Sequence, residues 1–330
     1  MPRPPTPKPQ VSAASLPSPP RTSPTFYYAD GDVVLRSSDG VQFRLHKLIL
    51  KIASPVFDDT FSVPQPPTAE TDSDIPIVDM AENEKVLRML LGFCYPGPPP
   101  PLSSLKDVRQ ALAVTSKFQI DNVDDFFRQK LLDAAEDHPE QVFAIGWAHQ
   151  WKDVVMAAAK ATLRKPFFTG TIVDEFDNIP ASAACKLLVY QRRCMKLCHM
   201  RTKSWGLWVT VEDVPRPLGV ESPIKASDPK FPCSCPGSVK LCKSNTSIMY
   251  PDIVVSRRFI KLMAAISDAV EDAPHPSSVT SPAVIQNSLL SEWTCSECRE
   301  GAACAVTEFT SRFAKMLNET ISKIDIVTPF

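Results

Sequence analysis

The sequence predicts an α+β fold, in which a small mixed sheet surrounded by helices is followed by a mostly α-helical region. Three observations predict it. Apolar residues alternate through residues 33–45, as they do along a strand hairpin. The apolar spacing then changes to three and four residues, which is typical of helices, and recurs towards residue 330. A stretch dense in Pro, Ser, Lys and Cys interrupts the helical pattern at residues 214–245.

The hairpin is the first element of this fold. Asp39 and Gly40 form a pair that tolerates positive φ, so the chain can reverse between two short strands. Period-two spacing places one set of side chains on the same face of the hairpin. The residues of that face are Val33, Leu35, Val41, Phe43 and Leu45.

Two helices are predicted after the hairpin. Counted from Leu45, the apolar residues Leu48, Ile49 and Ile52 follow i, i+3, i+4, i+7 spacing, so we expect them to pack back on the hairpin. Ser54 stands in an N-cap position, with a proline at the first helical turn after it. A second short helix should therefore begin there, with the apolar residues Val56, Phe57 and Phe61.

The remaining elements of this part are a strand and three helices. A proline-rich, acidic loop at 63–74 separates the second helix from the strand. The apolar pattern predicts the strand at 75–80 and the helices at 83–95, 105–118 and 123–135. This part therefore ends near residue 136.

The order Asp-Val, strand, Phe-x-x-His-Lys-x-x-Leu, Ser-x-x-Phe resembles the opening of a BTB/POZ domain. The strand and helices that follow are similar to its second half, which extends the resemblance over residues 26–136. It implies a non-enzymatic protein that binds other proteins, self-associates, and acts as an adaptor in ubiquitin-ligase recruitment or in transcriptional regulation. The matching residues are Asp32, Val33, Phe43, His46, Lys47, Leu50, Ser54 and Phe57.

The resemblance implies roles for three of these residues. The matching histidine is structural in the family, and His46 should link the hairpin to the helix by a hydrogen bond to the backbone. In BTB repressors, the residues matching Asp32 and Lys47 form a charged pair in a groove that receives corepressor peptides. An internal ion pair that fixes strand against helix is the alternative. Together with His46, the other matching residues form a structural signature, which comprises Val33, Phe43, His46, Leu50, Ser54 and Phe57.

Two departures from the family argue against particular partners. Cullin-binding BTB domains place a hydrophobic-x-Glu motif before the third strand, whereas this chain has Thr68, Ala69 and Glu70 without the hydrophobic anchor. Dimeric BTB repressors begin with an additional strand. Residues 1–25 are instead rich in Pro, Ser and Thr, which predicts a disordered tail and argues against a strand-swapped dimer.

The second half of the chain divides into three regions. Residues 137–209 are helical and look like the BACK-type region that follows some BTB domains. Residues 210–250 form an irregular Cys- and Pro-rich segment, and residues 251–330 form a C-terminal helical region. Within this last region we expect helices at 252–272, 284–290 and 306–326, with a loop at 273–282.

Cysteines supply a second hypothesis, a zinc-stabilised C-terminal module acting in transcription or nucleic-acid binding. A C-x-x-C spacing suits tetrahedral zinc, and two cysteines four residues apart share a helix face. Cys94 and Cys185 are predicted in the core, and Cys304 is a spare ligand. Reduced structural cysteines are the alternative, in which no cofactor is required. The candidate ligands are Cys194, Cys198, Cys233, Cys235, Cys242, Cys295 and Cys298.

Composition excludes several other functions. The 330 residues carry a net charge of −1, which gives no overall attraction for nucleic acid or anionic membrane. The sequence lacks a nucleophile elbow, a zinc-protease helix and a phosphate loop, so catalysis is not expected. An apolar run that would span a bilayer or direct secretion is missing, which predicts a cytoplasmic or nuclear protein.

Overall fold

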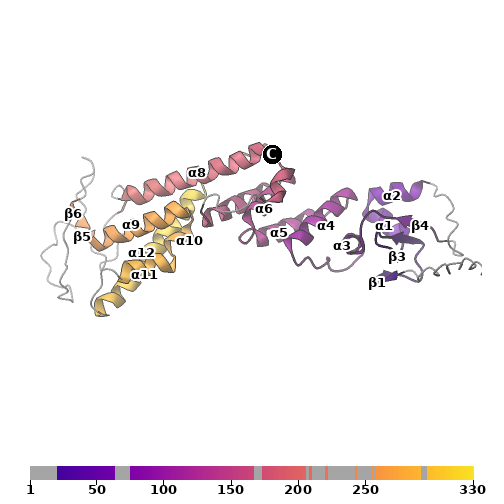
Figure 1. The fold of residues 1–330 in the computed structure, drawn as a ribbon, viewed down its shortest axis with the longest axis horizontal. Coiled ribbons are helices and arrows are strands. Elements are labelled where there is room, and N and C mark those ends of the chain that lie inside the picture. Colours follow the sequence, from indigo (N-terminus) through magenta and orange to yellow (C-terminus); the bar gives the residue numbers. More distant parts are fainter. Residues whose placement is uncertain are drawn as a thin grey trace, which may run out of the picture. The chain divides into compact units, whose positions relative to one another are not determined.

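The structure is a computed structural model that describes residues 21–63, 75–166, 173–205, 208–209, 220–221, 242–243, 254–255, 257–290 and 296–330. It divides into two compact units, Met1–Phe127 and Arg128–Phe330, which are described separately (Figure 1). Within the described ranges, no helix combines the length and the apolar character needed to cross a bilayer.

The first unit contains a four-stranded mixed sheet. Its strands are β1 (Arg21–Tyr27), β2 (Val33–Arg36), β3 (Val41–Leu45) and β4 (Ile77–Asp79), in the order β1-β3-β2-β4. β2 and β3 form the predicted antiparallel hairpin, whereas β1 pairs in parallel with β3, and β4 with β2. Gly40 has φ of +82° in the turn, which confirms the need for a residue that accepts positive φ.

The position of the first described strand differs from the prediction. Residues 1–25 were expected to form a tail, but β1 begins at Arg21. Its pairing with β3 is irregular between Thr22 and Tyr27, where the Ser23 hydroxyl accepts hydrogen bonds from nearby backbone N–H groups. An edge strand pairs on one side, so it tolerates Pro24, which lacks an N–H. An N-terminal strand is therefore present where the proline content argued against one.

Five helices are described in this part of the chain, the last of which crosses from the first unit into the second, and three of the five begin with an N-cap side chain. Ser54, Asn83 and Ser104 each accept a hydrogen bond from a backbone N–H of the following first turn. The predicted strand and helices are confirmed to within a few residues at each end. The helices are α1 (Lys47–Ala53), α2 (Pro55–Ser62), α3 (Glu84–Cys94), α4 (Leu105–Lys117) and α5 (Asp124–Ala134).

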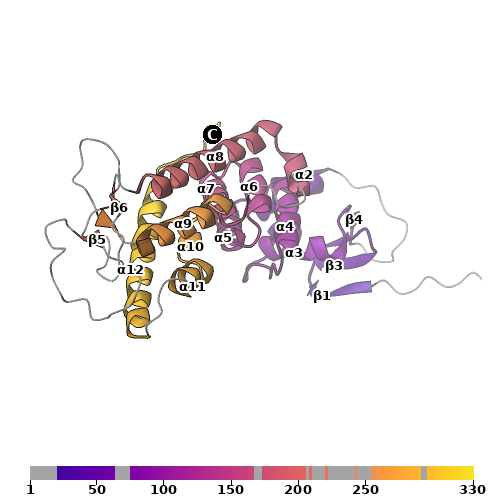
Figure 2. The ribbon, with the colours of Figure 1, turned by 60° about the vertical axis from the view of Figure 1, so that its left-hand side comes forward.

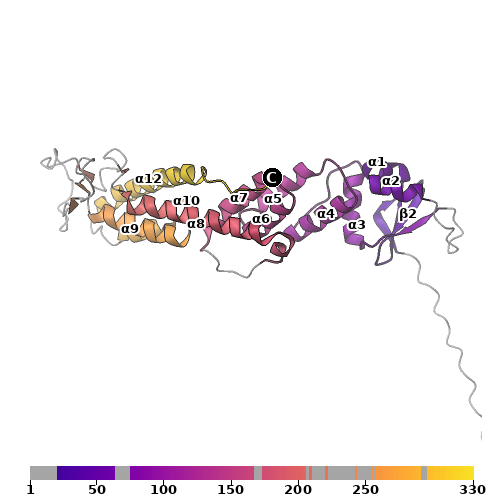
Figure 3. The ribbon, with the colours of Figure 1, turned by 90° about the horizontal axis from the view of Figure 1, so that it is seen from above.

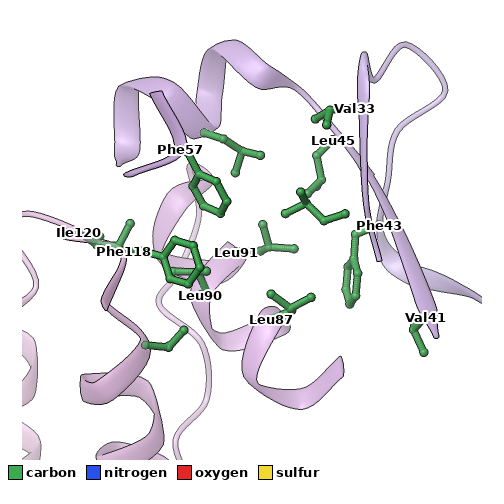
Figure 4. Close-up of a cluster of buried hydrophobic side chains, with 13 residues drawn as sticks. Val33, Val41, Phe43, Leu45, Phe57, Leu87, Leu90, Leu91, Phe118 and Ile120 are labelled. Atoms are coloured by element: carbon green, nitrogen blue, oxygen red, sulfur yellow. The ribbon is translucent and has the colours of Figure 1, made fainter. Parts of the chain in front are cut away.

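The core of the first unit lies between the hairpin and these helices (Figure 4). The strands contribute their inward-facing residues, and α1, α2, α3 and the end of α4 contribute large apolar side chains. Burying one such side chain stabilises the fold by about 1.5–3 kcal/mol. The central members include Val33, Leu35, Phe43, Leu45, Leu50, Phe57, Leu87, Leu90, Leu91 and Phe118.

The second unit is mostly helical. Figures 2 and 3 show α8 and α9 side by side, and α10 and α11 each pack against both α9 and α12. Phe259, Phe309 and Phe313 are buried where α9 meets α12. The helices are α6 (Pro139–Ala148), α7 (Lys152–Ala161), α8 (Ala181–Lys203), α9 (Arg257–Asp272), α10 (Pro276–Val279), α11 (Pro282–Leu290) and α12 (Ser296–Ile321), with 3-10 turns at Thr162–Arg164 and Asp174–Asn178.

Several boundaries in the second unit were predicted wrongly. The expected loop at 273–282 contains α10, because the His275 side chain caps a turn that begins with Pro276. The last helix begins at Ser296, ten residues before the predicted start, and ends at Ile321. Cysteines and small residues alternate in the first turns of this helix and give no clear apolar pattern of helical period, so the sequence did not reveal these turns.

The segment predicted to be irregular contains short strands. β5 (Val220–Glu221) and β6 (Cys242–Lys243) pair with β7 (Val254–Val255) in the order β5-β7-β6. β7 lies where the predicted helix was to begin, at residue 252, and α9 begins at Arg257 instead. A strand of two residues is too short to show a periodic pattern in the sequence. Such strands form because they pair with segments distant in the chain.

Candidate protein-interaction surface

Helix α1 of the sheet-containing unit exposes two of its large apolar side chains to solvent. Leu48 and Ile52, predicted to pack on the hairpin, are 68% and 78% exposed, whereas Leu50 is fully buried. The prediction counted helical spacing from Leu45, but Leu45 is the last residue of β3 and does not set the phase of α1. An i, i+4 pair of large apolar side chains therefore faces solvent, and we name it the α1 apolar pair.

Asp32, which directly precedes strand β2, caps the N-terminus of α1. The Lys47 backbone N–H donates a hydrogen bond of 2.7 Å to Asp32 Oδ1, and the His46 side chain at the N-cap position makes no capping bond. Asp32 thus satisfies one of the amides that a helix N-terminus leaves open, and its negative charge suits the helix dipole. The two residues meet through the Lys47 backbone rather than as the pair of charged side chains that we considered. Whether a partner uses this place stays a prediction.

His46 connects three parts of the unit. Its backbone N–H donates to Tyr95 Oη at 2.9 Å, its Nδ1 lies 3.3 Å from the same oxygen, and its Nε2 lies 3.2 Å from Asp30 Oδ1. The hydrogen bond from His46 lowers the pKa of Asp30. The histidine does link hairpin and helix, but its ring contacts the side chains of Asp30 and Tyr95 rather than the backbone.

Tyr95 is a residue that sequence reasoning missed. It follows α3, and its ring stacks on Tyr28 at 5.2 Å between centroids and packs against Phe26 at 5.8 Å. Burial raises the pKa of Tyr95 to about 12, so its hydroxyl keeps its proton. Its signal in the sequence is an aromatic residue just before the Pro-Gly pair that ends the helix.

The junction between α1 and α2 is fixed from both sides. Ser54 Oγ accepts from the Phe57 backbone N–H at 3.2 Å and donates to the Phe118 carbonyl at 2.5 Å. On the outside, Lys51 Nζ lies 2.9 Å from Asp58 Oδ1. The α1 apolar pair is therefore presented by a helix whose two ends are both held. Five of the six residues predicted as a structural signature, Val33, Phe43, Leu50, Ser54 and Phe57, are buried, whereas His46 is half-buried.

The family comparison agrees with this geometry. Residues 28–134 match the family model described as the BTB/POZ domain. This chain contains a BTB/POZ domain. Such domains are generally protein–protein interaction modules, and the domain of this chain has an exposed apolar pair on its first helix. No curated protein matches the chain.

The BTB domain match ends at residue 134, so the BACK-like interpretation of residues 137–209 stays a prediction. The cullin-related residues Thr68, Ala69 and Glu70 lie outside the described residues. Self-association and partner binding are general properties of BTB domains, whereas the identity of the partner is a matter for proposal.

Two of the candidate zinc ligands lie in the core of the second unit. Cys194 and Cys198 share the buried face of α8, as predicted, and Cys198 Sγ lies 4.0 Å from the Pro274 carbonyl oxygen. Burial raises the pKa of Cys194 to about 11 and that of Cys198 to about 12. Zinc binds thiolates, so these surroundings favour two reduced structural thiols.

The other candidate ligands are not placed by the structure. Cys233, Cys235 and Cys295 lie outside the described residues, and Cys242 and Cys298 are described in backbone only, within β6 and α12. Among the described residues, no group of three His, Cys, Asp or Glu side chains is arranged to hold a metal ion. The zinc hypothesis therefore stays a prediction.

Three cysteines outside this candidate set are described as well. Cys185, predicted in the core, is exposed, so that prediction was wrong. Cys304 is exposed on α12, and Cys94 is half-buried with its pKa raised to about 12 by burial. The three thiols therefore differ in their access to solvent.

Proposed function

We propose that this protein is a non-enzymatic scaffold whose BTB domain pairs with a second copy of itself through the α1 apolar pair. The observation that carries the proposal is the exposure of Leu48 and Ile52, at 68% and 78%, on a helix that is otherwise well anchored. Large exposed apolar side chains mark interaction sites when they occur together.

A two-fold arrangement suits this surface. In an isologous dimer each copy offers the same patch, so the α1 helices of two copies would bring four apolar side chains together. Burying each one would contribute about 1.5–3 kcal/mol before the costs of association are subtracted. The fixed ends of α1 reduce those costs, because little backbone must be ordered on binding.

Light scattering coupled to size-exclusion chromatography tests this proposal. The double variant Leu48→Asp, Ile52→Asp should elute as a monomer while the wild type elutes as a dimer. The matched control is Val63→Asp, which changes another exposed apolar residue, 61% exposed, at the C-cap of α2. A wild-type monomer, or a dimer that survives the double substitution, would contradict the proposal.

The scaffold would hold other proteins as an adaptor, either in ubiquitin-ligase recruitment or in transcriptional regulation. The supporting argument is the BTB domain itself, together with a second helical unit of its own. Affinity purification should recover the same partners with the wild type and with Val63→Asp. A Leu50→Asp variant disrupts a fully buried side chain and should lose them. Equal recovery with Leu50→Asp would remove the support for the BTB domain as the binding part.

A second candidate is a zinc-stabilised module in the second unit that acts in transcription or nucleic-acid binding. It is favoured by the sequence spacing of Cys295 and Cys298 and by the dense cysteines near residue 235. Metal analysis of protein washed with a weak chelator should then find about one equivalent of zinc, and a strong chelator should remove zinc and helicity together. Protein that is free of zinc and fully helical would exclude this candidate.

A further inference from the structure

The α8 helix is the most strongly charged element of the second unit. Over Ala181–Lys203 it carries six cations and no acidic residue, although the whole chain has a net charge of −1. Basic residues this dense repel one another unless an anion lies nearby. The six are Lys186, Arg192, Arg193, Lys196, Arg201 and Lys203.

Four of these cations face solvent, whereas Lys186 and Arg201 are half-buried and the Lys186 ammonium lies 5.3 Å from the centre of the Trp147 ring. Arg192, Arg193, Lys196 and Lys203 are exposed, while the opposite side of α8 is buried. Among the residues that the structure describes, none of the six forms an ion pair. By contrast, Arg36 on β2 forms a two-bond pair with Asp79, as expected of a cation that stabilises its own fold.

Apolar side chains are interleaved with the charges. Val189, Met195 and Met200 are 48%, 39% and 52% exposed on the same helix. Arginine and methionine are enriched in protein–protein interfaces, and methionine adapts its shape to a partner. We name the exposed residues Val189, Arg192, Arg193, Met195, Lys196, Met200 and Lys203 the α8 ridge.

A hollow of about 200 Å³ lies beside the α8 ridge. Leu163, Met195 and Pro274 contribute apolar lining, and Arg192 lies at the same hollow. Glu271 and Asp272 also line it and offset part of the positive charge there. The hollow is large enough for one apolar side chain of a partner, next to a cation that can hold a carboxylate.

We propose that the α8 ridge binds an acidic, amphipathic segment of another protein. Carboxylates of the segment would pair with Arg192, Lys196 and Lys203, which extend along about 16 Å of helix at 1.5 Å per residue. A leucine-like side chain would enter the hollow beside Met195. This surface lies in the second unit and is independent of pairing through the α1 apolar pair.

The apolar residues favour a polypeptide over a nucleic acid. Phosphate contacts need cations and polar groups, and exposed Val189, Met195 and Met200 would add little to a binding energy dominated by counterion release. An acidic protein segment with its own apolar side chains would use both kinds of residue. The charges would then raise the association rate and orient the segment on the helix, and the apolar contacts would provide most of the affinity.

Fluorescence anisotropy with three labelled probes tests the proposal on the full chain. The probes are an 18-residue peptide with leucines at helical spacing among glutamates, an 18-residue polyglutamate, and an 18-base-pair DNA duplex. The leucine-containing peptide should bind at least tenfold more tightly than either of the others. Equal binding of polyglutamate would overturn the role of the apolar residues, and tighter binding of DNA would assign the ridge to nucleic acid instead.

Two sets of variants separate the contribution of the charged residues to peptide binding from that of the apolar residues. The triple variant Arg192→Gln, Lys196→Gln, Lys203→Gln should weaken peptide binding tenfold or more, whereas Arg192→Lys, Lys196→Arg, Lys203→Arg should keep it. The pair Val189→Ser, Met195→Ser should weaken the leucine-containing peptide and leave polyglutamate unchanged. All are exposed positions, and an unchanged melting temperature confirms folding. Undiminished binding by the Gln variant would contradict the proposal.

Discussion

The Asp32 carboxylate accepts a hydrogen bond of 2.7 Å from the backbone N–H of Lys47 and thereby caps α1 from outside its own sequence. The residue that a local reading of the sequence would place at the cap, His46, uses its ring elsewhere. The position of α1, and with it the α1 apolar pair, depends on a contact between residues fifteen positions apart.

We predict that Asp32→Ala destabilises the BTB domain by about 1 kcal/mol, since it removes a helix cap. Lys47→Met should change the unfolding free energy by less than about 0.5 kcal/mol, because the backbone N–H remains. Urea denaturation of the two single variants and the double variant measures both effects. They should add, because the Lys47 ammonium takes no part in the cap. Strong coupling between them would show that the two side chains interact directly.

Tyr95→Phe should destabilise the domain by about 1–3 kcal/mol. The substitution keeps the stacked ring but leaves the His46 backbone N–H without its acceptor. Thermal and urea unfolding provide the measurement. Tyr27→Phe is the matched control. Because Tyr27 is 46% exposed, loss of its hydroxyl should not change the stability of the domain. A variant as stable as the control would mean that water replaces the hydroxyl.

The second unit should lose stability in mild acid because of His275. Burial lowers the pKa of His275 to about 4, with smaller contributions from the nearby charges of Arg164 and Lys160. The unfolded chain takes up this proton near pH 6.5, before the folded chain does. The unfolding free energy should therefore fall as pH drops from about 6.5 to about 4, by an amount on the order of 3 kcal/mol.

Urea titrations at several pH values measure this effect. His275→Gln should flatten the profile between pH 6.5 and pH 4, while His138→Gln, at an exposed position, should leave it unchanged. Identical profiles for wild type and His275→Gln would mean that other groups cause the loss.

Thiol labelling should separate the described cysteines into two classes. Cys185 and Cys304 are exposed, so iodoacetamide at pH 8 should modify them readily in the folded protein. Cys194 and Cys198 should react after denaturation, because burial keeps their thiols protonated and inaccessible. Peptide mass spectrometry gives the extent at each site. Early labelling of Cys198 would reveal opening between α8 and α9.

Local pattern was sufficient to predict the hairpin, the cap at Ser54 and the helices from α3 to α8. Each of these depends on neighbours within a few residues, so alternation, helical spacing and cap residues reveal them. The same holds for the buried signature that includes Phe43 and Leu50. The sequence by itself therefore predicted a BTB domain over residues 26–136, and the family model matches residues 28–134.

Tertiary structure decided the features on which the two proposed binding surfaces depend. The phase of α1, which turns Leu48 and Ile52 to solvent, is set by how β3 ends and by the distant cap from Asp32. Tyr95 contacts His46 only because the fold brings the two residues together. Likewise, β1 forms a strand by pairing with β3, although its proline-rich composition predicted a disordered tail. The exposure of the α8 ridge depends on which face α9 covers. These properties arise from contacts between residues far apart in the chain, and such contacts leave no periodic signal in a single sequence.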